Sequence, residues 1–284
     1  MARSGKVKGT PSVLHITSMG LAAFLLATPP GCVTFRQGAA RTSRSITLPA
    51  QPEPISIDAA RTALIVVDMQ NDFGSKGGMF DRAGIDISGI QKAVGPTARA
   101  IAASRKAGIK VIYLKMGYQP DLSDAGPPDS PSRMRHRRMN IGEVITAPDG
   151  TESRILVRDT WNTAILPELA PERGDVVINK NRYSGFYKTN LDRILKRMGV
   201  RHLVVTGCTT SVCVDSTIRD AMFRDYRCVL LTDCTAEPQG VGNANYDASL
   251  LIVRTLLGWT STSDEFIRAL ETSGQVATES LTRS

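Results

Sequence analysis

The sequence is poor in histidine and aromatic residues and has no long apolar run. Its three histidines are His15, His136 and His202, and no second Cys/His pair accompanies Cys208 and Cys213 at zinc-ligand spacing, which argues against a structural zinc site. The most apolar stretch, residues 13–28, is diluted by polar residues and falls short of the ~20 apolar residues that span a membrane. Aromatic residues do not alternate with the clustered basic residues, as they do in proteins that bind single-stranded nucleic acid.

Cysteine is too scarce for a fold that depends on disulfides. The chain has five cysteines, an odd number in 284 residues: Cys32, Cys208, Cys213, Cys228 and Cys234. This usage favours reduced thiols and a cytoplasmic location. A redox protein that uses Cys208 and Cys213 is an alternative, but such pairs at the start of a helix usually have two intervening residues, and this pair has four.

The net charge of +8 is concentrated in two segments. Residues 1–45 contain basic but no acidic residues, and residues 133–138 read RMRHRR. The rest of the chain is close to neutral. We therefore expect no nucleic-acid partner and interpret residues 133–138 as a solvated loop, with attraction of an anionic substrate as the alternative.

The first 55 residues are predicted to be an N-terminal extension. Lys6 and Lys8 precede the apolar stretch, as in a signal peptide, but the prolines before Cys32 make a poor lipoprotein cleavage site. The possibilities are a disordered extension or an over-extended start, an exported or lipid-anchored protein, and a docked helix. Residues 33–55 are rich in Arg, Ser, Thr and Pro and are interpreted as a linker.

From residue 56 onward, apolar runs alternate with helical patterns. Residues 63–67 (ALIVV) are typical of a strand buried on both faces of a parallel sheet. A helix over 90–107 and a strand over 110–115 complete a βαβ unit, and residues 117–158 are predicted to be mostly loop. Further strands are expected over 175–178, 202–205 and 227–232, and further helices from 189, after 213, over 246–257 and over 264–270.

This pattern predicts one α/β domain over residues 56–272, with helices on both faces of a mostly parallel sheet, and a disordered tail over 273–284. In such sheets, ligands bind outside the carboxyl ends of the strands. Three reactive side chains are expected there. Asp68 follows the first strand, Lys180 the third and Cys213 the fourth.

Cys213 stands in GCTTSVCV (residues 207–214), which we interpret as a strand end, a tight turn and the first turn of a helix. A helix N-terminus has unpaired N–H groups and about half a positive charge, which favours a thiolate and can hold an oxyanion. Taken alone, the stretch would equally fit a buried structural cysteine. With Asp68 to take the thiol proton and Lys180 to orient both groups, the set favours nucleophilic acyl chemistry.

Three motifs resemble the isochorismatase-like cysteine hydrolases. They are ALIVVDMQNDF at residues 63–73, NKNRYSGF at 179–186 and GCTTSVCV at 207–214, and the resemblance extends over residues 60–270. It implies a Rossmann-like three-layer αβα sandwich with a mostly parallel sheet. It also implies that Asp68, Lys180 and Cys213 form a catalytic triad.

The same resemblance implies a backbone arrangement around the nucleophile. A non-proline cis peptide is expected near Cys208-Thr209, and the backbone N–H groups of Thr209 and Cys213 are expected to form an oxyanion hole. Ser211 departs from the pattern, because many members of the family have Asp or Asn there. The turn is expected to survive, since Ser also forms local hydrogen bonds to the backbone.

Details of the motifs separate branches of the family. Nicotinamidases have an Asp and two His as metal ligands, and this chain has no histidine between Asp68 and Ser132, so we expect no metal. RYSGF at 182–186, together with GG at 77–78 and DSTIRD at 215–220, resembles the ureidoacrylate amidohydrolases. KMGYQPDLSD at 115–124 instead resembles the biuret hydrolases. Both branches cleave a C–N bond of a ureido or carbamoyl group.

We therefore predict a cofactor-independent cysteine amidohydrolase acting on a small linear ureide. Asn71, Lys115, Trp161 and Tyr183 are predicted to line the substrate pocket, although ordinary packing would also explain Trp161 and Tyr183. We also expect a homo-oligomer, either a dimer or a tetramer. The alternatives are hydrolysis of biuret or an N-carbamoyl amino acid, vinyl ether cleavage by an isochorismatase proper, and a catalytically silent binding protein.

Overall fold

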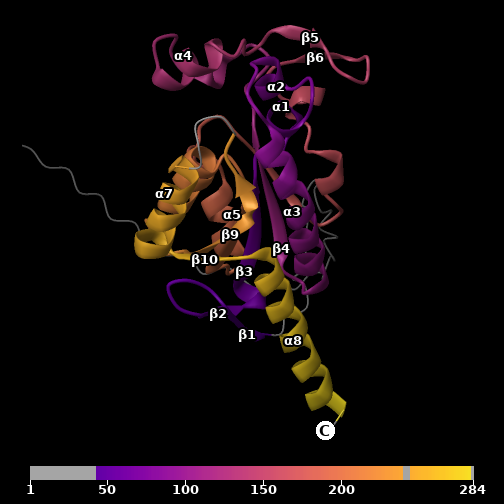
Figure 1. The fold of residues 1–284 in the computed structure, drawn as a ribbon, viewed down its shortest axis with the longest axis vertical. Coiled ribbons are helices and arrows are strands. Elements are labelled where there is room, and N and C mark those ends of the chain that lie inside the picture. The colour runs from indigo at the N-terminus through magenta and orange to yellow at the C-terminus, as the bar shows by residue number, and fades with distance from the viewer. Residues whose placement is uncertain (1–42, 239–243, 283–284) are drawn as a thin grey trace, which may run out of the picture. The chain divides into compact units, whose positions relative to one another are not determined.

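The centre of the fold is a six-stranded parallel sheet. The computed structural model describes residues 43–238 and 244–282, with side chains up to residue 274, and all of these belong to one compact unit. Every pairing within the sheet is parallel, which confirms the predicted α/β class (Figure 1). In sheet order the strands are β10 (Trp259–Ser261), β9 (Arg227–Ala236), β8 (His202–Cys208), β3 (Thr62–Val67), β4 (Lys110–Met116) and β7 (Val176–Lys180).

Helices cover both faces of this sheet. Figure 1 shows α3 and α8 on one side of the sheet and α5 and α7 on the other, so the predicted three-layer αβα sandwich is confirmed. The helices are α1 (Asn71–Gly74), α2 (Met79–Arg82), α3 (Ser88–Lys106), α4 (Pro131–Arg137), α5 (Leu191–Arg197), α6 (Asp215–Met222), α7 (Ala244–Ile252) and α8 (Ser263–Thr282). Short 3₁₀ turns are η1 (Ala59–Arg61), η2 (Ser123–Ala125), η3 (Trp161–Thr163) and η4 (Pro167–Leu169), and π-helical turns are η5 (Thr210–Val214) and η6 (Val253–Leu257).

Strand β3 explains why both faces need a helical layer. All of its residues are buried. Leu64 and Val66 belong to the core shared with α3, whereas Ile65 and Val67 belong to the core shared with α5 and α6. Successive side chains on a strand point to opposite faces, so a continuous apolar run gives a strand with no face toward solvent.

The carboxyl ends of four neighbouring strands meet at one edge of the sheet. Val67 of β3 pairs with Leu114 of β4 on one side and with Gly207 of β8 on the other. Gly207 has a φ of 114°, and a Cβ there would lie 2.0 Å from the Val67 carbonyl oxygen. Only glycine permits this close approach of the two strands. This is the edge at which the sequence predicts the reactive side chains.

An antiparallel hairpin precedes the sheet. It consists of β1 (Ser45–Leu48) and β2 (Ile55–Asp58). Ile46 and Leu48 are buried in the core, and β1 packs against α8. The prediction of a linker over residues 33–55 is therefore wrong for its last part, because the alternating sequence 45–48 forms a strand with one buried face. The predictions for residues 1–42 lie outside the described residues.

The C-terminal helix is longer than predicted. α8 runs through residues 263–282 rather than 264–270 and includes most of the segment 273–284 that we expected to be a disordered tail. Within residues 43–238 and 244–282, none of the helices combines the length and the apolar character needed to span a membrane.

The basic run at residues 133–138 is mostly exposed to solvent, as predicted, but it forms a helix rather than a loop. Most of it lies in α4, whose first turn contains Pro131 and whose N-cap Ser130 accepts the backbone N–H of Arg133 at 3.4 Å. The hairpin of β5 (Val144–Thr146) and β6 (Glu152–Arg154) follows. The predicted long loop over 117–158 therefore contains regular elements, which Figure 1 shows at the top of the view with α1 and α2.

Candidate active site

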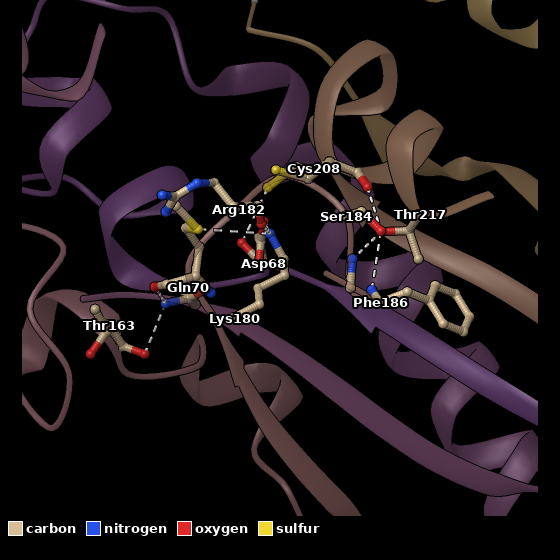
Figure 2. A network of polar contacts seen from close by, with 12 residues as sticks. Asp68, Gln70, Thr163, Lys180, Arg182, Ser184, Phe186, Cys208 and Thr217 are labelled. Atoms are coloured by element: carbon tan, nitrogen blue, oxygen red, sulfur yellow. Dashed lines mark hydrogen bonds and ion pairs between the residues drawn. The ribbon is translucent and has the colours of Figure 1, made fainter. Parts of the chain in front are cut away.

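A buried ion pair joins the ends of two strands. Lys180 is the last residue of β7, and Asp68 directly follows β3. The Lys180 Nζ lies 2.7 Å from the Asp68 Oδ2, and the two side chains are 0% and 1% exposed (Figure 2). Burial raises the pKa of Asp68 against the opposing charge of Lys180. Burial also acts to lower the pKa of Lys180, but the negative charge of Asp68, with hydrogen bonds to Asp68 and Cys213, outweighs it and raises that pKa.

The backbone of Asp68 lies in the left-handed region, with a φ of 51°. Its N–H donates to the Leu114 carbonyl at 2.9 Å, and its carbonyl accepts the Gln70 N–H at 2.8 Å. The Cys208 thiol donates to the same carbonyl, with an Sγ–O distance of 3.2 Å (Figure 2). Such a backbone is uncommon for a residue other than glycine and persists where its surroundings hold it.

Cys213 joins this pair from the π-helical turn η5, which precedes α6. The residue is 8% exposed. Burial raises the pKa of its thiol, the charge of Lys180 lowers it, the charge of Asp68 raises it, and the net direction is upward. Burial therefore opposes the thiolate that the helix terminus is expected to favour, and that expectation stays a prediction.

The turn before Cys213 is anchored on several sides. The Cys208-Thr209 peptide bond is cis, as the family resemblance implies. The Thr209 carbonyl accepts the N–H groups of Val212 at 3.2 Å and Val214 at 3.1 Å, and the Glu237 carboxylate accepts that of Ser211. The role of the Thr209 and Cys213 N–H groups as an oxyanion hole stays a prediction.

Asn71 and Trp161, both predicted to line the pocket, are joined to each other. The Asn71 Nδ2 donates to the Trp161 carbonyl at 2.8 Å, and the Asn71 Oδ1 accepts the Ser75 hydroxyl at 2.8 Å. Asn71 is buried, and Trp161 is half-buried in η3. The Asn71 amide therefore holds the loop that carries Trp161. Contact of either residue with a substrate stays a prediction.

Tyr183 and Lys115 differ in their relation to the reactive groups. Burial raises the pKa of the Tyr183 hydroxyl, and the neighbouring Cys213 adds to this rise. Met116 pairs with Lys180, so strand alternation turns the half-buried Lys115 to the opposite face from Lys180. Burial lowers the pKa of Lys115, against the charge of Asp159. Substrate binding by Tyr183 or Lys115 stays a prediction.

Gln70 is a fully buried residue that sequence reasoning missed. Its Oε1 accepts the Met116 N–H at 2.7 Å, and its Nε2 donates to the carbonyls of Met116 at 2.9 Å and Thr163 at 3.1 Å (Figure 2). It thereby holds the end of β4, beside Lys180, against the loop around η3. The sequence did contain a signal, which is the position of a polar residue shortly after a buried strand. A polar group buried there needs hydrogen-bond partners within the fold.

Asp72 is a second buried polar residue that the sequence did not single out. Its Oδ1 accepts the Met79 N–H at 3.0 Å and the Asn162 amide at 2.5 Å, and its Oδ2 accepts the Leu156 N–H at 2.8 Å. It forms no ion pair with another described residue. Burial raises its pKa to about 6, against these hydrogen bonds. Asp72 therefore ties the segment after β3 to the segment that leads into η3.

We expect Asp72→Asn to change the pH dependence of unfolding. The pKa of Asp72 is about 6 in the fold against an ordinary value of 3.8, so its contribution to stability is present below pH 3.8 and is lost as the pH rises through about 6. The loss amounts to about 3 kcal/mol. Urea unfolding at several pH values should show the wild-type free energy of unfolding falling by this amount relative to the variant.

Asp58→Asn is the matched control for this experiment. Burial acts to raise the pKa of Asp58, but hydrogen bonds from Ser43, Ala60 and Arg44 outweigh it, and the pKa is lowered. The difference between wild type and this variant should therefore grow as the pH rises, the opposite sign. A pH-independent difference for Asp72→Asn would contradict the prediction.

His136 docks the basic helix α4 beside the reactive groups. It is buried, its Nδ1 lies 2.5 Å from the Tyr118 hydroxyl, and its ring packs edge-on against Tyr183 with centroids 6.2 Å apart. Burial, with the charges of Lys180 and Arg182, lowers the pKa of His136 to about 4, so the ring is neutral near pH 7. Tyr183 is also a residue whose hydroxyl pKa Cys213 raises, so α4 packs on a side chain that senses the thiol.

The family to which this arrangement belongs follows from a comparison of sequences. The profile of the isochorismatase domain matches residues 62–265, a range that contains Asp68, Lys180 and Cys213. The chain belongs to the isochorismatase family. In the part of the chain that the structure describes, no three His, Cys, Asp or Glu side chains are grouped as metal ligands would be.

Proteins similar to this chain include some that are named as amidohydrolases or amidases. Ureidoacrylate amidohydrolase RutB of Variovorax paradoxus is 43% identical over 222 residues, which cover 78% of this chain and 86% of that protein. A cysteine hydrolase from Pseudomonas syringae pv. phaseolicola is 31% identical with a TM-score of 0.65, over 81% of this chain and 98% of that one. N-carbamoylsarcosine amidase from Thermoplasma acidophilum is 28% identical with a TM-score of 0.52, over 72% and 97%.

Proposed function

We propose that this protein is a cysteine amidohydrolase that cleaves the C–N bond of a small linear ureide similar to ureidoacrylate. The observation that carries the proposal is the fully buried Lys180–Asp68 ion pair with the Cys213 thiol beside it, whose pKa burial raises. A thiol that is neutral at rest needs a base, and the raised pKa of Asp68 suits it to that task. The names of the relatives, ureidoacrylate amidohydrolase and N-carbamoylsarcosine amidase, support the substrate class.

The proposed reaction has two steps. Asp68 takes the proton of Cys213, and the sulfur attacks the ureido carbonyl carbon. The C–N bond breaks, and the leaving nitrogen departs with the proton that Asp68 returns to it, which leaves a carbamoyl or acyl thioester on Cys213. Asp68 then deprotonates a water molecule, which attacks the thioester carbonyl and releases the enzyme. Lys180 keeps Asp68 and Cys213 in register throughout.

Two further groups of residues have proposed roles. The backbone N–H groups of Thr209 and Cys213 hold the oxyanion of each tetrahedral intermediate, an effect worth roughly 10²–10³ in rate for each donor. The hydrogen bonds that fix the turn to Glu237 and to the Thr209 carbonyl support this role. Asn71, Lys115, Trp161 and Tyr183 form the pocket wall, supported for Tyr183 by the electrostatic effect of Cys213 on its hydroxyl.

An unpaired cation near the site favours an anionic ureide over neutral biuret. The half-buried Arg182 guanidinium donates to the carbonyls of Asp124 at 3.1 Å and Asn181 at 2.6 Å, and it forms no ion pair with a carboxylate of the described residues. The charges of Arg182 and Lys180 both lower the pKa of His136. A substrate carboxylate would supply the missing negative charge, whereas biuret would not.

A panel of ureides tests the proposed function. Ammonia release should be fastest with ureidoacrylate, slower with N-carbamoyl amino acids and slowest with biuret, and it should be absent with nicotinamide. The methyl ester of ureidoacrylate is the matched control for charge, because it keeps the ureido group and removes the carboxylate. Equal kcat/KM for the acid and the ester would refute the anionic preference. The absence of ammonia release from every ureide would refute the function. Turnover of isochorismate alone would favour vinyl ether cleavage.

We also propose that the enzyme is a cytoplasmic homo-oligomer. Large apolar side chains are exposed on Phe223, Leu251 and Leu256, at 71%, 49% and 74%, and association of copies would cover them. The described cysteines are all free thiols, which supports a reducing compartment. A monomeric mass by light scattering would refute the oligomer.

A further inference from the structure

Cys208 has a contact that simple packing does not require. It is the last residue of β8 and is 1% exposed. Its thiol donates to the carbonyl of Asp68, on the neighbouring strand end, at 3.2 Å (Figure 2). Burial raises the pKa of this thiol well above its ordinary value, so it stays protonated and remains a donor.

The Asp68 backbone needs support from outside its own strand. Its φ of 51° lies in the left-handed region, which is unfavourable for a residue with a Cβ. Two of its supports are backbone hydrogen bonds, to Leu114 on β4 and from Gln70 in the same turn. The Cys208 thiol adds a support from a side chain on β8, the strand that leads directly into the turn of Cys213.

This placement links the proposed base to the strand of the proposed nucleophile. A turn of the Asp68 peptide plane would move the carboxylate away from the Lys180 Nζ, which it meets at 2.7 Å. Both groups are fully buried, so water cannot replace the lost contact cheaply. A small displacement at such a site can cost about 10²-fold in rate.

We propose that Cys208 is a positioning residue, whose thiol holds the backbone of Asp68 so that its carboxylate meets Lys180 and Cys213. The inference rests on the proposed function, in which Asp68 is the base. Cys208 acts through Asp68 and does not touch the substrate. It is therefore neither a second nucleophile nor only a packing residue.

Substitutions of Cys208 distinguish the role of its hydrogen-bond donor from that of its side-chain volume. Cys208→Ala removes the donor and should lower kcat by about 10- to 100-fold with little change in KM. The acidic limb of its pH–rate profile should move to higher pH, because a carboxylate held less firmly against Lys180 has its pKa raised further by burial. Cys208→Ser keeps a hydroxyl donor and should recover kcat to within about fivefold of wild type. If Cys208→Ala fails to fold, Cys208→Val keeps the volume without the donor and replaces it.

Cys228→Ala is the matched control. Cys228 is also a free, fully buried cysteine, but it lies near the start of β9, where it pairs with Leu203 at the far end of the sheet. The substitution removes the same atom from the core and should lower the melting temperature without moving the acidic limb. Equal losses of kcat in Cys208→Ala and Cys228→Ala would overturn the inference, as would a Cys208→Ser variant no better than Cys208→Ala.

A second readout does not depend on ureide turnover. The rate at which iodoacetamide alkylates Cys213, located by peptide mass mapping, reports how readily Asp68 takes the thiol proton. Its pH profile should shift in Cys208→Ala and return in Cys208→Ser. Identical alkylation profiles in wild type and Cys208→Ala would overturn the positioning role. A wild type that is alkylated but hydrolyses no ureide would refute the proposed function instead.

Discussion

Cys213→Ala is expected to lower kcat/KM for the ureide substrate by at least about 10³-fold, because the proposed reaction has no path around the thioester. The variant should stay folded. Cys213 is buried in the core beside α6, and the loss of one sulfur atom there costs about 1 kcal/mol. Steady-state ammonia release and a thermal unfolding curve on the same preparation measure both quantities.

Cys228→Ala should retain full activity, which separates loss of the nucleophile from loss of any buried thiol. Mass spectrometry of wild type quenched during turnover should find the carbamoyl or acyl adduct on the peptide that contains Cys213. Full turnover by Cys213→Ala would contradict covalent catalysis and point to chemistry that does not use the thiol, such as vinyl ether cleavage.

Lys180→Met is expected to remove activity and stability together. The Asp68 carboxylate would lose its only ion-pair partner within the described residues and remain fully buried. Breaking such a pair from one side costs about 3–5 kcal/mol. Without the opposing charge, burial raises the pKa of Asp68 still further, so Asp68 is protonated near pH 7 and cannot accept the Cys213 proton. We expect kcat/KM to fall at least about 10³-fold. The acidic limb of the pH–rate profile of the remaining activity should move to higher pH.

Two variants isolate the cause. Asp68→Asn combined with Lys180→Met removes both charges, so it should recover most of the stability and none of the activity. Lys196→Met removes an exposed lysine whose Nζ lies 2.7 Å from Asp192 on the same helix, and it should change stability by less than about 1 kcal/mol. A Lys180→Met enzyme with the wild-type pH profile would show that Asp68 does not depend on Lys180.

The sheet and the meeting of Asp68, Lys180 and Cys213 at one edge follow from patterns within short stretches of sequence. The continuous apolar run in β3 specifies a strand buried on both faces, and a parallel sheet places the residues after its strands at a common edge. The structure brings the Lys180 Nζ within 2.7 Å of the Asp68 carboxylate, although the two residues are 112 positions apart in the sequence. The family resemblance and its cis peptide are confirmed as well.

The errors fall where distant partners decide the outcome. The segment 45–48 carries only a weak alternation, and it becomes a strand because Ile46 and Leu48 find a place in the core beside α8. Residues 131–137 appear solvated from their charge, yet they form a helix that docks through a single buried residue, His136, against Tyr118 and Tyr183. No local sequence pattern indicates such contacts, because each one joins residues that are far apart in the sequence and that only folding brings together.

The sequence by itself determined the fold class, the family and which three side chains meet, because these depend on periodicity, strand order and motif spacing. Tertiary structure alone decided the burial of Cys213, the left-handed backbone of Asp68 and the thiol contact from Cys208. The physical reason is that each depends on contacts between segments that are far apart in the sequence. Removal from water opposes the charged form of a thiol, and the degree of burial is a property of the whole fold.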